Sequence, residues 1–173
     1  SVADLIAHRQ RSERLVERVS ESPIATDAGP ALAYAYRTPF DTTQHLAVVF
    51  GDIGEGRGVP VRFHHESVVR DVFVAKGSLD RMIERVASGG RGVIVYLREG
   101  AVGVADTANR PRDGVGATPD SAASREREWR EVGLGAQILK DLGVKSIRLL
   151  ASRERRYVGI DGFGIAIDDT EIV

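Results

Sequence analysis

Cysteine is absent from the 173 residues of the chain, which excludes disulfides and every metal site built on thiolates. No charge of one sign dominates, because 24 basic residues face 25 acidic ones and the net charge is −1. No global field therefore favours nucleic acid or an acidic membrane. No run approaches the roughly 20 apolar residues that span a bilayer. We expect neither nucleic acid nor a membrane as a partner.

A hydrophobic content of 42% over this length supports one well-buried core, and we expect one domain over residues 1–173. The opening segment, SVADLIAHRQRSERLVERV, alternates apolar and charged residues at near-helical spacing. Because it has no continuous apolar stretch, it predicts a linker helix over residues 1–20 rather than a signal sequence. The expected location is the cytoplasm.

Strand-like and helical patterns alternate along the chain, which predicts an α/β or α+β fold. The expected strands are residues 31–37, 45–51, 59–64, 93–97 and 147–150. The expected helices are residues 78–88 and 129–142. The strands at 45–51 and 59–64 are joined by the glycine-rich turn GDIGEGRG and predict a hairpin-like unit.

Three further segments have their own interpretation. Residues 68–75 are a third short apolar run after the two strands of that unit. Residues 104–124 are rich in Gly, Pro, Asp, Arg and Ala without any period, which predicts a flexible loop. Gly133 and Gly135 are interpreted as close-packing points or a turn near a helix start.

Several stretches together resemble one enzyme family. They are VADLIAHRQRSERLVERV with AYAYRTPFD, VPVRFHHESVVRDVF, GRGVIVYLREG and GLGAQILKDLGVKSIRLL. The chain resembles GTP cyclohydrolase II, specifically the C-terminal domain of bifunctional riboflavin enzymes whose other half is a dihydroxybutanone phosphate synthase. The resemblance implies that family's fold, with mixed sheets and flanking helices, a homodimer, and a role in riboflavin biosynthesis.

The family opens the guanine ring with a water activated by zinc, which three cysteines hold. In this chain Ser67 takes the place of the first cysteine, and residues 74–78 are too few to carry the other two. We therefore expect no zinc and no metal ligands, although magnesium is compatible with a bound nucleotide. A substitute site would have to use His64, His65, Glu66 and Asp71.

That substitute set has a geometric problem. On a strand His64 and Glu66 share one face while His65 points to the other, so a site would need Asp71 to fold back. The alternative is that His64 is simply a hydrogen-bonded histidine near a cleft.

Other family roles are carried over residue by residue. Arg130 matches the arginine that attacks the α-phosphorus, and Glu128 stands where an aspartate would activate it. The alternative is that both belong to a solvated first turn of a helix. The resemblance assigns nucleotide contacts to Arg62, Glu99, Gly100 and Arg156. Ala101 replaces an expected arginine, and the family's catalytic tyrosine has no counterpart.

These losses favour a domain that no longer opens guanine and acts as a binding, dimerising or regulatory module. Its expected ligand is GTP or a related nucleotide, and its expected partner is a fused or paired dihydroxybutanone phosphate synthase domain. Two alternatives remain open: a nucleotide hydrolase that releases pyrophosphate through Arg130, and an active cyclohydrolase with a substitute metal.

Overall fold

A single mixed sheet forms the centre of the structure, a computed structural model that describes residues 16–39, 41–74, 76–98, 122–152 and 160–173. Its seven strands are β1 (Glu17–Thr26), β2 (Gly29–Thr38), β3 (Asp41–Phe50), β4 (Val59–His65), β5 (Gly92–Leu97), β6 (Ser146–Ala151) and β7 (Ala166–Ile172). The helical elements of the described part are η1 (Val69–Phe73), α2 (Ser78–Ser88), α3 (Ala122–Asp141) and η3 (Ile160–Phe163).

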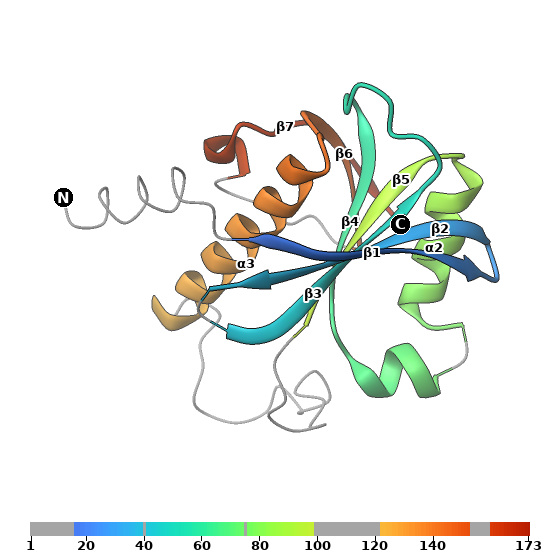
Figure 1. The fold of residues 1–173 in the computed structure, drawn as a ribbon, viewed down its shortest axis with the longest axis horizontal. Coiled ribbons are helices and arrows are strands. Elements are labelled where there is room, and N and C mark those ends of the chain that lie inside the picture. Colours follow the sequence, from blue (N-terminus) through green and yellow to red (C-terminus); the bar gives the residue numbers. More distant parts are fainter. Residues whose placement is uncertain (1–15, 40, 75, 99–121, 153–159) are drawn as a thin grey trace.

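The strand order is β1-β2-β3-β5-β4-β6-β7, and the sheet has two halves of different kind. β1, β2, β3 and β5 pair antiparallel in succession, whereas β5, β4, β6 and β7 pair parallel. Parallel neighbours need long crossovers. α2 lies on the connection from β4 to β5 and α3 on that from β5 to β6, on opposite sides of the sheet (Figure 1). The α/β fold class is confirmed.

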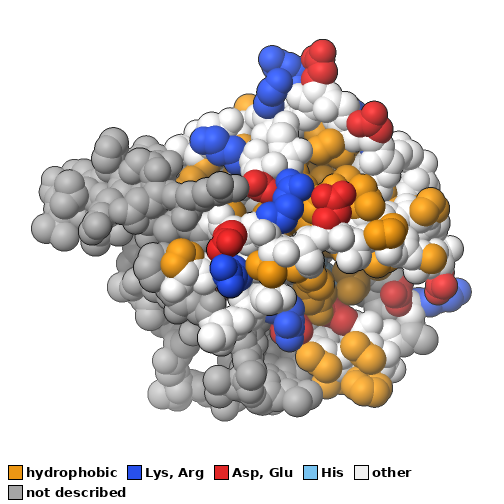
Figure 2. Space-filling model, in the orientation of Figure 1, with side chains coloured by type: hydrophobic (Ala, Val, Ile, Leu, Met, Phe, Trp, Pro, Cys, Tyr) orange, Lys and Arg blue, Asp and Glu red, His pale blue; other side chains and the backbone are white. Residues whose placement is uncertain are grey.

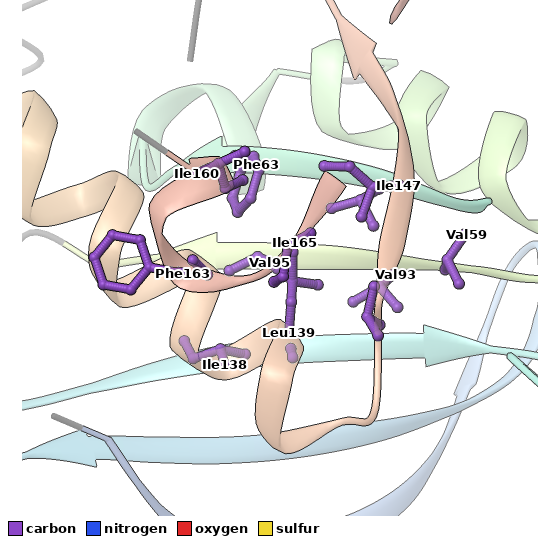
Figure 3. Packing of buried hydrophobic residues seen from close by; sticks show 14 of the residues in the cluster. Val59, Phe63, Val93, Val95, Ile138, Leu139, Ile147, Ile160, Phe163 and Ile165 are labelled. Atoms are coloured by element: carbon purple, nitrogen blue, oxygen red, sulfur yellow. The ribbon is translucent and has the colours of Figure 1, made fainter. Parts of the chain in front are cut away.

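The larger core cluster lies between the sheet and α3. Because side chains alternate along a strand, Val59, Val61 and Phe63 of β4 all belong to this cluster. Figure 3 shows side chains of β4 and β5 converging with those of α3 and η3, among them Phe63, Val95, Ile138, Leu139 and Phe163. A smaller cluster on the α2 side includes Val86, Ile94 and Leu150.

Two glycines let α3 approach the sheet closely. A Cβ at Gly135 would lie 2.4 Å from the ring of Phe63, and one at Gly133 would lie 2.9 Å from the ring of Phe163. Both glycines are in the interior of α3, where glycine is otherwise unfavourable. Their interpretation as close-packing points is confirmed, while a turn near the helix start is not found.

The predicted hairpin of residues 45–51 and 59–64 is wrong, because β5 lies between β3 and β4. The loop between β3 and β4 is instead held by hydrogen bonds to the segments that precede β6 and β5. The backbone N–H groups of Lys145 and Ser146 both donate to the Gly56 carbonyl, at 2.7 and 3.1 Å. Arg91 donates to the carbonyls of Ile53 and Arg57. The loop therefore carries the chain across the start of β5 instead of turning it back.

Three other expected boundaries are corrected. Residues 17–20 of the expected linker helix belong to β1, where pairing with β2 overrides the local helical period; residues 1–15 lie outside the described part. α3 begins at Ala122, ahead of the predicted start at Trp129, so the last residues of the expected loop are helical. The apolar run at 68–75 contains η1, a single π-helical turn. No helix of the described part is long and apolar enough to cross a membrane.

Replacing Gly135 by alanine should destabilise the fold by about 1–2 kcal/mol. Overpacking a core costs about 1–3 kcal/mol, and the approach of 2.4 Å to Phe63 is close enough for the upper part of that range. About 1–2 kcal/mol then remains after the roughly 1 kcal/mol that alanine gains over glycine in a helix. Urea denaturation followed by circular dichroism measures the effect, and Lys140→Ala, at an exposed position of the same helix, is the control. A Gly135→Ala protein as stable as the wild type would contradict the close contact with Phe63.

Candidate functional site

Polar side chains gather where the two central parallel strands end. In the register of β4 and β5, His64 lies opposite Tyr96. Their rings stack with centroids 5.3 Å apart and 19° between the planes. Both residues alternate with core residues that face α3, so both side chains lie on the other face of the sheet. Ligands of α/β proteins commonly bind outside the carboxyl ends of the strands, and this edge is the candidate site.

Asp71 of η1 folds back onto this edge and uses both oxygens of its carboxylate. Oδ1 lies 2.9 Å from Nε2 of His64. Oδ2 accepts the Tyr96 hydroxyl at 2.6 Å and the backbone N–H of Ser67 at 2.9 Å. The side chains of His64 and Asp71 are only 7% and 4% exposed. A buried carboxylate with three donors is fully engaged by the protein itself.

The titration behaviour of the cluster follows from burial. Burial lowers the pKa of His64, against the opposing effect of Asp71, so the imidazole is neutral at pH 7 and donates Nε2–H to the carboxylate. Burial also raises the pKa of Tyr96 well above its ordinary value, and the hydrogen bond to Asp71 adds to the shift. The phenol therefore stays protonated and acts as a donor.

The other two candidate ligands are directed elsewhere. Glu66 accepts a hydrogen bond from Nε of Arg98 at 3.0 Å. His65 lies with Nε2 3.6 Å from a carboxylate oxygen of Glu131 on α3, on the opposite face of the sheet from His64. The expected division of the two histidines between the two faces is confirmed. Asp71 does fold back, and its carboxylate contacts His64, Tyr96 and the Ser67 amide.

The donors at this edge do not fit zinc. Ser67 occupies the position that the resemblance gives to the first zinc cysteine, and its buried hydroxyl has no hydrogen-bond partner among the residues that are described. Zinc in proteins takes thiolate, imidazole or carboxylate ligands, and a neutral hydroxyl is none of these. Among the residues that the structure describes, no group of three His, Cys, Asp or Glu side chains could hold a metal ion.

Arg62 is the one predicted nucleotide contact whose side chain is described. It is half-buried and reaches the end of β6, where it donates to the Leu150 carbonyl at 3.1 Å and to Oγ of Ser152 at 3.3 Å. The structure thus brings Arg62 together with Ser152, just beyond the end of β6.

The remaining predicted residues are only partly placed. Glu128 and Arg130 lie in the first half of α3, but their side chains lie outside what is described. Glu99, Gly100 and Arg156 fall outside the described residues.

Tyr96 is the site residue that sequence reasoning missed. A usable signal exists in the strand Gly92–Leu97, GVIVYL, where a hydroxyl-bearing side chain stands near the carboxyl end of an otherwise apolar run. The pairing with His64 is not visible in the sequence, because it depends on the parallel register of β4 and β5.

Removing the carboxylate with Asp71→Ala should cost about 3 kcal/mol or more of unfolding free energy. Each buried donor left without a partner costs about 1–3 kcal/mol, and His64, Tyr96 and the Ser67 amide lose theirs together. The matched variant Tyr96→Phe removes one donor and should cost about 1 kcal/mol. Urea denaturation compares the two; equal losses would mean that Asp71 does not organise the cluster.

Acidification should weaken the fold through His64. Because the pKa of folded His64 lies below its ordinary value of 6.5, the unfolded chain takes up a proton first as the pH falls below about 6.5. This contribution is fully present above that pH and is lost as the pH falls towards the folded value. Its slope is at most about 1.4 kcal/mol per pH unit. His64→Gln keeps an N–H donor and should show a shallower loss between pH 7 and 5; an unchanged slope would contradict the assignment.

Comparison with known proteins gives one family. The model of GTP cyclohydrolase II matches residues 17–172. The bifunctional riboflavin biosynthesis protein RIBA 1 of Arabidopsis thaliana is 38% identical, over 96% of this chain and 33% of that protein. The riboflavin biosynthesis protein RibBA of Nocardia farcinica is 39% identical, over 98% of this chain and 44% of that protein.

A solved structure is also similar. RibBX, described as a two-domain 3,4-dihydroxy-2-butanone 4-phosphate synthase from A. baumannii, is 28% identical with a TM-score of 0.60. The match covers 99% of this chain and 44% of that one. The chain thus spans between a third and a half of the length of these relatives. On the family match and on these identities, the chain belongs to the GTP cyclohydrolase II family.

Proposed function

We propose that this chain is a GTP cyclohydrolase II-type module of riboflavin biosynthesis that no longer opens the guanine ring. It works instead as a binding and regulatory partner of a 3,4-dihydroxy-2-butanone 4-phosphate synthase domain. The observation that carries the proposal is the closed cluster of Asp71, His64 and Tyr96 at the position that the resemblance gives to the metal.

The energetics of the cluster support the loss of ring opening. For Asp71 to ligate an ion, its carboxylate would have to leave three protein donors, two of them on buried or half-buried rings. Each buried donor that loses its acceptor in this way costs about 1–3 kcal/mol. No thiolate is available to offset that cost, since the sequence has no cysteine.

The names of the relatives support a synthase domain as the partner. RibBX is named for the synthase activity alone, although a chain of this type matches 44% of it. Relatives of both kinds exist, since a monofunctional riboflavin biosynthesis protein, RIBA 2 of Arabidopsis thaliana, is 36% identical over 96% of this chain. The family therefore includes proteins named for two activities and proteins named for one.

Nucleotide binding is part of the proposal. Arg62 stands in the middle of β4, and its guanidinium reaches the carboxyl end of β6, where an anion would meet it. Glu99, Gly100 and Arg156 are the further contacts that we propose, with magnesium accompanying the phosphates. A homodimer and a cytoplasmic location are likewise proposals.

One observation favours a second candidate function, the release of pyrophosphate through Arg130. The contact between His65 and Glu131 places this part of α3 beside the end of β4. Glu128 and Arg130 come just before Glu131 on α3, so their backbone lies near this end of β4, on the face of the sheet opposite to the Arg62 side chain.

A single assay separates these functions. The purified chain is incubated with GTP and Mg²⁺, with and without equimolar Zn²⁺, and formate and pyrophosphate are measured. We expect no formate above a protein-free control, because no donor set at the site activates water. A family member that retains its zinc cysteines, run in parallel, should release formate.

Formate released over many turnovers would overturn the proposal. Pyrophosphate release that disappears in Arg130→Ala would favour the second candidate, whereas equal release by both proteins would exclude it. Circular dichroism of each protein shows that the comparison is made on folded chains.

A further inference from the structure

The turn formed by Val68–Val74, hereafter the 68–74 turn, presents apolar side chains to solvent. Phe73 is 76% exposed, Val72 69% and Val74 50%, and Val68 and Val69 are close to 40% exposed. Figure 2 shows hydrophobic side chains gathered at the lower right, over the part of the molecule where Figure 1 draws the turn that precedes α2. Contiguous exposed apolar residues of this kind mark interaction sites.

The turn is held in this orientation by its one acidic residue. Asp71 points inward to His64 and Tyr96, and its backbone N–H donates to the Ser67 carbonyl at 2.7 Å. The polar side chain therefore takes the inner position, and the valines and the phenylalanine are left outside. The exposure of these apolar residues therefore follows from the inward position of Asp71.

The end of the turn is fixed as well. A Cβ at Gly77 would lie 2.9 Å from the Arg70 carbonyl, so the chain passes very close to itself here. Lys76 has a φ of 54°, a left-handed conformation that is uncommon for a residue with a side chain. The carboxylate of Asp80 accepts the Gly77 N–H at 2.9 Å. The apolar surface is thus preorganised.

Elsewhere in the described part, exposed large hydrophobics do not form such a group. Val19 stands alone on the edge strand β1, and Ile172 and Val173 are the last two residues. The 68–74 turn is therefore the surface of the described residues that most needs a partner.

The charged residues around the 68–74 turn indicate which kind of surface could bind it. Lys76 lies just beyond the turn and Arg81 on the first part of α2, and both are exposed. The nearby acids Asp71 and Asp80 are engaged within the chain. Two copies meeting through this turn would bring these cations together, which opposes association. An apolar groove with carboxylates at its rim is the complementary surface.

We propose that the 68–74 turn docks the 3,4-dihydroxy-2-butanone 4-phosphate synthase domain, through an apolar groove of that domain rimmed with carboxylates. This inference rests on the proposed function and adds the surface that performs it. Phe73 is the central anchor, since aromatic residues at the middle of an interface contribute most to affinity.

The test uses this chain and the synthase of the same cell, as the full-length protein if the two share a polypeptide and as a mixture if they do not. Binding, or for the fused protein the contact between domains, is followed by sedimentation velocity and cross-linking, with synthase turnover measured alongside. The variants are Phe73→Glu and the matched control Val19→Glu, at an exposed valine on β1. Thermal unfolding checks that both fold.

We expect Phe73→Glu to weaken the contact at least tenfold and to change synthase turnover, while Val19→Glu behaves as the wild type within twofold. Raising the ionic strength, which shortens the Debye length from about 30 Å at 0.01 M to about 3 Å at 1 M, should weaken the wild-type contact.

The failures are distinguishable. If the wild type binds the synthase and Phe73→Glu binds equally well, the docking surface is wrong and the proposed function stands. If the wild type neither contacts the synthase nor alters its turnover, the proposed function fails and the docking surface with it. If Phe73→Glu instead dissociates a dimer of this chain and leaves the synthase contact intact, the surface belongs to a second copy and the inference is overturned.

Discussion

The carboxylate of Asp71 is the constraint on which the rest of the site depends. A buried charge is tolerated only when donors surround it, and here a histidine, a tyrosine and a backbone amide do so. Asp71 lies in the middle of η1, so the hydrogen bonds of its carboxylate fix the orientation of the whole 68–74 turn. The carboxylate faces inward and the apolar side chains of the turn face solvent. One residue thus engages the donors at this edge of the sheet and leaves the apolar side chains of the turn exposed.

The scaffold and the site of this protein are separable. The scaffold depends on close packing of α3 against the parallel half of the sheet, where Gly135 meets Phe63, and the family model matches nearly the whole chain, residues 17–172. The site depends on a few donors at the ends of β4 and β5, and these donors pair with one another. Fold can therefore persist while the chemistry of the site changes.

The sequence predicts the elements better than their arrangement. Residues 31–37 and 93–97 were expected as strands because alternating or continuous apolar residues report burial directly, and both lie within observed strands. The predicted hairpin was wrong because the sequence around a strand does not determine which strand pairs with it. Here β5, which is distant in the sequence, lies between β3 and β4. At the site, a hydrogen-bonded His64 was foreseen. The sequence suggested Asp71 only as a metal ligand and did not suggest Tyr96. The contact between these two residues depends on the register of β4 and β5 and on the π-helical turn η1, neither of which the sequence reveals.

The protonation state of His64 tests the central claim most directly. Long-range ¹H–¹⁵N spectra of the imidazole at neutral pH, before and after addition of equimolar Zn²⁺, report which nitrogen carries the proton. A neutral ring protonated at Nε2, unchanged by the metal, is the result that follows from the bond to Asp71. Loss of the Nε2 proton with stoichiometric uptake of zinc would contradict it, because His64 would then be a ligand rather than a donor.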